Sequence, residues 1–159
     1  MIDWLMNHEF VQEFATDALR LFIAMVLGGA LGIERQLHGR WAGIRTHMMV
    51  SLGAAIFTLA ALSTAPNDPN EVTRVIQGIA AGIGFLGAGT IVTLKGEVEV
   101  KGLTTASSIW ITAAIGTAAG LGEIAMAVAS CLAALSVMAI LRPFTKAMGK
   151  DVVSDERDG

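Results

Sequence analysis

The sequence GIAAGIGFLGAGT at residues 78–90 combines strong apolar character with a high glycine content that no other part of the chain matches. Each glycine inside a helix costs roughly 0.5–1 kcal/mol relative to alanine, so a helix of this composition is disfavoured in water. In a bilayer, each unpaired backbone group costs several kcal/mol, so an apolar segment remains helical. Small residues then allow neighbouring helices to approach closely. The stretch therefore predicts a membrane-spanning helix, over residues 75–94, at the crowded centre of a bundle.

The same glycines match the spacing of a dinucleotide-binding motif, as Gly82-x-Gly84-x-x-Gly87. That motif follows a strand, begins a helix and is followed by an acidic residue about twenty positions later. Here the glycines lie inside an uninterrupted apolar segment, and residues 102–108 contain no carboxylate. We therefore predict no nucleotide site and no other cofactor.

The composition is that of a polytopic membrane protein. Of the 159 residues, 53% are hydrophobic and 16% are charged, and the mean hydropathy is +0.62. A soluble domain has about 25% charged residues. The single cysteine, Cys131, excludes a disulfide within the chain.

Apolar periodicity and turn signals divide the chain into five predicted spans, so the expected fold is an all-α bundle of five transmembrane helices. The spans cover residues 14–34, 46–65, 75–94, 103–120 and 124–141. A proline-rich turn at 66–70 and a charged connection at 95–102, which alternates like a small hairpin, separate three of them. Arg142 and Pro143 are expected to end the last span. The predicted domains are an acidic interfacial segment at 1–13, the transmembrane domain at 14–143 and a short mobile cytoplasmic tail at 144–159.

Basic residues predict the orientation of the chain. In the five-span arrangement nine of the 11 basic residues fall on one side, and only Arg20 and Arg74 fall on the other. Because positive residues stay in the cytoplasm, the amino terminus is predicted outside and the carboxyl terminus inside, in a bacterial inner membrane. Asp17 and Arg20 are three residues apart on one helical face, where they can pair.

Four motifs resemble the MgtC/SapB family of bacterial inner-membrane proteins. They are GIERQ at 32–36, GRWAGIRTH at 39–47, GIGFLGAGT at 82–90, and KGLTTA at 101–106 followed by Ser108-x-Trp110. The resemblance implies a five-helix inner-membrane domain and an association with magnesium limitation, acid stress or survival inside host cells. Many family members also carry a soluble carboxy-terminal domain, and we expect this chain to be a short form without it.

The polar connection after the first span contains a cluster of charged residues, Glu34, Arg35, Arg40, Arg45 and His47. A carboxylate at the edge of hydrocarbon is costly unless it is paired. One interpretation is a functional cluster that gates or binds something, and the other is a structural clamp between the first two spans. We hypothesise that Arg45 reaches Glu34 across the loop. His47 titrates near neutral pH, which suits a proton sensor, but a lone histidine at this position is more often a hydrogen-bonded anchor.

Small and hydroxyl residues of the third and fourth spans form the second candidate set. They can pack helices closely, or they can line a polar path beside backbone freed from helical bonding. The residues are Gly78, Gly82, Gly84, Gly87, Gly89, Thr90, Thr104 and Thr105. No metal site is predicted, because Mg²⁺ prefers oxygen ligands that include carboxylates. Within the spans only Glu34 and Asp17 could serve, at opposite ends of one helix.

No nucleophile with an adjacent base is recognisable, so we predict that the chain is not an enzyme. Spans this short and few hardly enclose a pore alone, which favours a homo-oligomer in the lipid bilayer, without nucleic acid. Two functions remain. The first is a regulatory protein that acts through another membrane protein in magnesium homeostasis or stress. The second is an oligomeric channel or transporter for magnesium or another cation.

Overall fold

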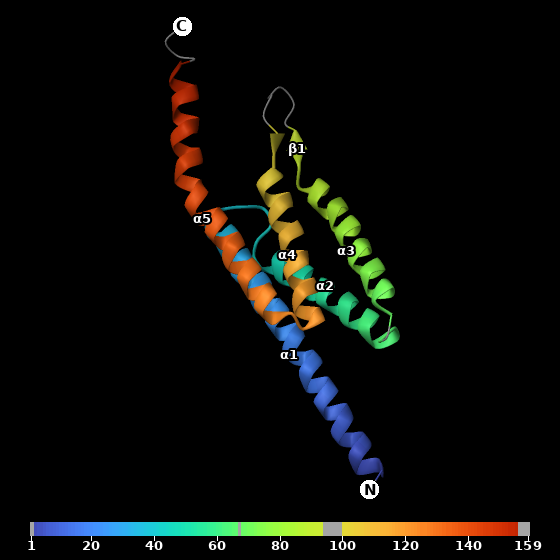
Figure 1. Ribbon diagram of the computed structural model, residues 1–159. Helices are drawn as coiled ribbons and strands as arrows, with labels where there is room; N and C mark the ends of the chain where they lie inside the picture. Colours follow the sequence, from blue (N-terminus) through green and yellow to red (C-terminus); the bar gives the residue numbers. More distant parts are fainter. Residues whose placement is uncertain (1, 67, 94–99, 156–159) are drawn as a thin grey trace.

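The computed structural model of the chain describes residues 2–66, 68–93 and 100–155, and it confirms the all-α bundle (Figure 1). Its five helices are α1 (Ile2–Leu37), α2 (Ile44–Thr64), α3 (Pro69–Gly89), α4 (Leu103–Leu121) and α5 (Ile124–Asp155). Two short antiparallel strands, β1 (Val92–Thr93) and β2 (Val100–Lys101), pair between α3 and α4. The strands agree with the expected small hairpin, whose central residues 94–99 lie outside the described ranges.

In the described part of the chain, three helical segments are long and apolar enough to cross a membrane: His8–Leu37, Ile44–Thr64 and Pro69–Gly89. A shorter apolar segment, Ile124–Ile140, belongs to α5. Helix α4 contains six Ser and Thr residues, which lower its hydropathy. These hydroxyl residues are tolerated because α4 packs against each of the other four helices.

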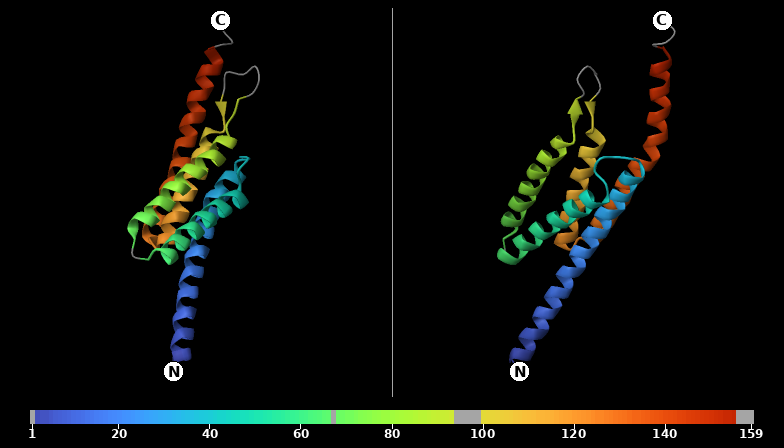
Figure 2. Two further views of the ribbon diagram at one scale, coloured as in Figure 1. Left: turned by 90° about the vertical axis from the view of Figure 1, so that its right-hand side faces the viewer. Right: turned by 180° about the vertical axis from the view of Figure 1, so that it is seen from behind.

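The centre of the bundle is α4, which corrects the prediction that the glycine-rich helix occupies it. Eleven residues of α4 are buried, whereas Gly87 is the one buried residue of α3 among those described. Helix α3 packs against α4 and, less extensively, against α2. Figure 2 shows it on the outside of the bundle. Glycine content alone therefore did not identify the central helix.

Helices α1 and α5 extend beyond the membrane spans predicted for them. Helix α1 has 36 residues and a length of roughly 54 Å, and it continues without a break through the predicted boundary at residue 13. Helix α5 does not end at Pro143 but continues to Asp155, through most of the predicted tail. The two helices lie side by side within the bundle, and their amino-terminal and carboxy-terminal ends project from opposite ends of it (Figure 2).

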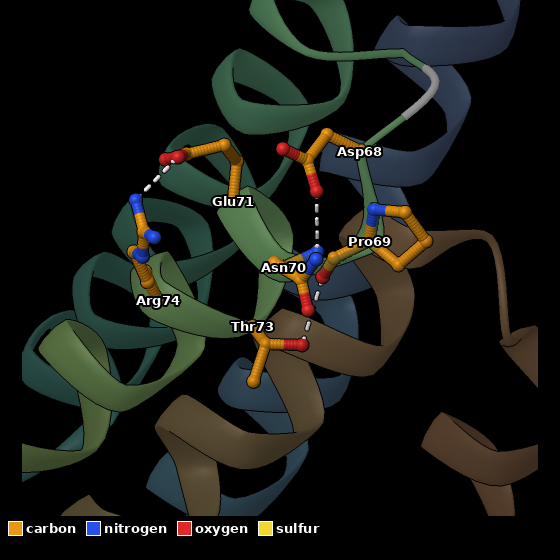
Figure 3. A network of polar contacts seen from close by, with 6 residues as sticks. All are labelled: Asp68, Pro69, Asn70, Glu71, Thr73 and Arg74. Atoms are coloured by element: carbon orange, nitrogen blue, oxygen red, sulfur yellow. Dashed lines mark hydrogen bonds and ion pairs between the residues drawn. The ribbon is translucent and has the colours of Figure 1, made fainter.

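Local capping sets the start of α3, six residues before the predicted position. The Asp68 carboxylate accepts a hydrogen bond from the backbone N–H of Asn70 at 2.9 Å, and Pro69 occupies the first helical turn (Figure 3). Aspartate before proline is a favourable combination for starting a helix. Glu71 and Arg74 form an exposed ion pair one turn further on. The helix ends at Gly89, five residues before the predicted end of the span.

Candidate functional site

Four glycines bring the backbones of α1, α2 and α4 together. A Cβ atom on Gly28 of α1 would lie 2.6 Å from the carbonyl oxygen of His47, and one on Gly32 would lie 2.5 Å from Cα of Ile44. On α4, a Cβ atom on Gly116 or Gly120 would lie 2.1 or 2.8 Å from a carbonyl oxygen of α2. Real Cβ atoms do not approach this closely, so only glycine permits these helix contacts.

The three-helix contact encloses a row of polar side chains, which we call the buried polar interface. Most of its hydroxyls bond to carbonyl oxygens of their own helix, as Thr112 does to Ser108 at 2.7 Å. The interface comprises Arg35 from α1, His47, Ser51 and Thr58 from α2, and Thr105, Ser108 and Thr112 from α4.

Arg35 joins the end of α1 to the start of α4. Its side chain is 4% exposed, and Nη2 donates a hydrogen bond to Oγ1 of Thr105 at 3.0 Å. A buried guanidinium needs such partners because removing its charge from water is costly. Thr105 therefore supplies a hydrogen-bond acceptor that helps to fix the position of the Arg35 side chain.

His47 joins α2 to α4. The imidazole is fully buried, with Nδ1 2.9 Å from the carbonyl oxygen of Gly43 and Nε2 3.1 Å from Oγ of Ser108. A carbonyl oxygen can only accept, so Nδ1 carries a hydrogen. The ring thus bonds to two elements at once, as the anchor interpretation requires.

The predicted pair of Glu34 and Arg45 is wrong. The Glu34 carboxylate lies 2.9 Å from Nδ1 of His38, one turn further along α1. Residues four apart share a helical face, so this local contact forms without a loop. Arg40 and Arg45 are exposed, and of the five clustered residues only Arg35 and His47 are buried.

The predicted pairing of Asp17 with Arg20 also does not form. Arg20 instead directs Nη1 towards the carbonyl oxygen of Gly120, at 3.5 Å, near the carboxyl end of α4. Its guanidinium also lies beside Gly122, where the chain turns into α5 in a left-handed conformation (φ +85°). A cation at the end of a helix interacts favourably with the last carbonyl groups. Arg20 thus contacts the turn between α4 and α5.

The predicted glycine and hydroxyl set is divided by the structure. In this chain a Cβ atom on Gly78, Gly82, Gly84 or Gly89 would meet nothing within 4 Å, and one on Gly87 would meet Ala106 at 3.5 Å.

Among the three threonines of that set, only Thr105 reaches the buried polar interface. Thr90 is half-buried and bonds to Gly87 of its own helix, whereas Thr104 is exposed.

Sequence reasoning missed the glycines that make the close contacts. Gly28 and Gly32, and likewise Gly116 and Gly120, are each four residues apart. That spacing is the small-residue signal for helix association in membranes, so the pattern was available in the sequence. The longer glycine run of α3 gave a stronger sequence signal of the same kind than these two shorter motifs.

Metal-binding chemistry is sparse at the site. Among the described side chains, no three His, Cys, Asp or Glu residues are grouped closely enough to hold a metal ion. The buried polar interface offers hydroxyls, one imidazole and one guanidinium. Such a set suits hydrogen bonding between helices better than coordination of a hard cation.

Comparison with known proteins identifies relatives over most of the chain. The chain is 39% identical to Protein MgtC of Salmonella paratyphi A over 140 residues, which is 88% of this chain and 58% of the relative. It is 41% identical to Protein MgtC of Brucella abortus over 137 residues, covering 86% of this chain and 56% of the relative. Protein SrpB of Synechococcus elongatus is 42% identical over 115 residues, covering 66% and 63%.

The chain thus spans less than two thirds of the length of the curated relatives it matches. No solved structure matches it significantly. The model of the MgtC family matches residues 21–147, a range that contains the glycine contacts of α1, α2 and α4. The chain belongs to the MgtC family.

Proposed function

We propose that the chain is a regulatory protein of the bacterial inner membrane, which acts on magnesium homeostasis or on acid and intracellular stress through another membrane protein. Membership of the MgtC family, and the similarity to two proteins named MgtC, support the link to magnesium. The proposal includes self-association in the bilayer and no enzymatic activity. The observation that carries it is the contrast between a closed interior and an open face on α3.

The interior of the described bundle favours a binding role over conduction. Where α2 and α4 cross, Gly116 lies against the backbone of Ser51, and no additional atom fits between them. The hydroxyls of Thr58 and Thr112 bond to their own helices at 2.8 and 2.7 Å. An ion path needs space and oxygen ligands that can exchange with water. Close backbone contact at the centre of a single chain provides neither.

The exposed surface of α3 has the opposite character, and part of it borders a cleft towards α2. Gly78 and Gly82 are exposed with open space beside them, and Phe85 is 84% exposed. In a membrane, small residues favour close approach of a second helix through packing. Such a surface fits a partner helix, from another membrane protein or from a second copy of the chain.

Oligomeric ion conduction is the second candidate. A cleft of about 560 Å³ lies between α2 and α3 and is lined by Gly53, Gly78 and Gly82 together with apolar side chains. Several copies could combine such clefts around a shared axis. The apolar lining favours lipid or helix contacts over a hydrated cation, so we place this function second.

The proposed orientation has the amino terminus outside and the carboxyl terminus in the cytoplasm. In the bundle, the connection from α1 to α2 and the β1–β2 ribbon lie towards the same end as the carboxyl terminus, and the amino terminus lies at the other (Figure 1). That connection contains Arg40, α2 begins with Ile44 and Arg45, and β2 contains Lys101, so these basic residues belong to elements near one end. The positive-inside rule assigns that end to the cytoplasm.

Two measurements test the proposed function. Purified chain reconstituted in liposomes is expected to give no Mg²⁺ flux above protein-free liposomes. A flux that scales with protein content would overturn the regulatory proposal in favour of the conduit.

The second measurement is growth of a strain that depends on the chain under magnesium limitation. Gly82→Leu alters the open face of α3 and is expected to abolish growth while the protein remains folded and membrane-inserted. Ala129→Leu, at an exposed position of α5, is the matched control and is expected to support growth. Equal growth of both variants would contradict the role assigned to α3.

A further inference from the structure

The hydrogen bonds around His47 require one more hydrogen than a neutral ring supplies. Nδ1 donates to the Gly43 carbonyl, so in the neutral ring Nε2 is an acceptor. Ser108 lies 3.1 Å from Nε2 and also 2.8 Å from the carbonyl oxygen of Thr105. A serine hydroxyl has one hydrogen, so it cannot donate to both acceptors at the same time.

Both contacts are satisfied together only when His47 carries a second hydrogen. Nε2–H then donates to the Ser108 oxygen, and the Ser108 hydroxyl donates to the Thr105 carbonyl. With a neutral ring, the same hydroxyl must turn towards Nε2 and leave the Thr105 carbonyl. The direction of one hydroxyl therefore depends on the protonation state of one buried imidazole.

We propose that His47 is a proton-binding site in the contact between α1, α2 and α4, and that proton binding reverses the donation of the Ser108 hydroxyl. One proton enters at Nε2, no covalent bond of Ser108 breaks, and its O–H only rotates. The inference does not depend on the proposed function, because it concerns the hydrogen-bond arrangement within one chain.

The groups that face His47 couple this proton to the rest of the interface. From α1, Glu34 and Arg35 are near enough to interact electrostatically with the ring. Helix α4 has no ionisable residue.

Helices α2 and α3 carry three further charged residues. Arg45, on the same helix as His47, is exposed. Glu71 and Arg74 of α3 lie in its first turns, towards the opposite end of the bundle (Figure 1). Proton binding thus adds positive charge beside Arg35, whose partner Thr105 also supplies the carbonyl that receives the Ser108 hydrogen.

This coupling places the response at the end of α1. Like charges close together repel, and a low local dielectric strengthens the effect. Protonation of His47 therefore weakens the hold of Arg35 on Thr105 while it strengthens the bond from Ser108 to the Thr105 carbonyl. The proton therefore binds at His47 of α2, and the contact between α1 and α4 responds to it.

Nuclear magnetic resonance of the full ¹³C,¹⁵N-labelled chain in lipid bilayers tests the proposal across a pH series. The neutral ring is expected to be the Nδ1–H tautomer and to convert reversibly to the doubly protonated form. The carbonyl ¹³C shift of Thr105 is expected to move with the same midpoint as the His47 nitrogens.

Variants assign the coupling to one hydroxyl. Ser108→Ala is expected to abolish the movement of the Thr105 carbonyl shift. Ser107→Ala removes a neighbouring hydroxyl that bonds only within α4, and it is expected to leave the movement unchanged. The decisive observation is made on the unaltered chain, so it does not require that Ser108→Ala folds.

Three results would overturn the proposal. The first is a His47 that stays neutral throughout the pH range in which the bundle is folded. The second is a neutral ring with its hydrogen on Nε2. The third is a His47 that titrates while the Thr105 carbonyl shift remains constant.

Discussion

At the scale of single residues, the direction of each side chain decides its role. Arg35 and Arg45 belong to the same sequence cluster, but Arg35 is buried against Thr105 and Arg45 is exposed. The sequence predicted a cluster at the end of the first span because charge near hydrocarbon needs partners. It could not predict which members turn inward, because packing against α4, far along the chain, sets the rotation of α1 and α2.

Removing the Thr105 hydroxyl is predicted to destabilise the bundle. Thr105→Val leaves Arg35 without one acceptor, and hydrogen bonds to charged groups contribute about 1.5–3 kcal/mol. Thr104→Val, at the neighbouring exposed position, is the matched control and should have little effect. The free energy of unfolding in mild detergent measures the difference. Equal stability of the two variants would show that the Arg35 contact is not formed in solution.

A double-mutant cycle of Glu34→Gln and Arg45→Gln is predicted to be additive. The two side chains form no ion pair, and separated sites add within about 0.3–0.5 kcal/mol. Unfolding free energies of both single variants and the double variant give the coupling. A coupling energy well above that range would indicate that Glu34 and Arg45 do interact, as the clamp hypothesis requires.

At the scale of elements, the sequence predicted five helices and the position of the short hairpin. The boundaries of α3 were wrong because the Asp68 cap was not recognised as the helix start. The apolar part of α5 ends at Ile140, one residue before the predicted end of the span, but the helix itself continues past Pro143, which was expected to end it. Local capping and tertiary packing decide such positions, and neither is visible in hydropathy.

Two leucine substitutions on α3 are predicted to differ. Gly87→Leu places a large side chain against Ala106 of α4, where a Cβ atom would already be 3.5 Å away. Gly84→Leu meets open space in the single chain. Gly87→Leu should therefore lower the apparent Tm of the monomer in detergent, and Gly84→Leu should not. An equal loss for both variants would indicate that α3 packs into the bundle more deeply than described.

At the scale of the whole molecule, the two termini lie at opposite ends of the bundle (Figure 1). An odd number of crossings requires this arrangement. Reporter fusions test it directly: a fusion after Gly159 is predicted to be active only in the cytoplasm, and a fusion after Asn70 only outside. Activity of both fusions on the same side would contradict the five-span arrangement.

The shape of the core could be predicted only in part. Composition and motif order indicated a helical membrane bundle, and the structure agrees. The choice of the central helix was wrong, because the many glycines of α3 outweighed the two spaced pairs, Gly28 with Gly32 and Gly116 with Gly120. Glycine allows two helices to approach closely, but close contact also requires a partner helix on the facing side.

The central claim is that α1, α2 and α4 form the close-packed core and that α3 lies outside it. The most direct test is the thermal stability, in a detergent that keeps the chain monomeric, of Gly116→Ala and Gly82→Ala. A Cβ atom at residue 116 would lie 2.1 Å from the Ser51 carbonyl oxygen, whereas one at residue 82 meets nothing within 4 Å. Overpacking costs about 1–3 kcal/mol, so Gly116→Ala should lower the apparent Tm clearly. Gly82→Ala should leave it unchanged or slightly raised, because alanine favours the helix. A tolerated Gly116→Ala together with a damaging Gly82→Ala would contradict the account.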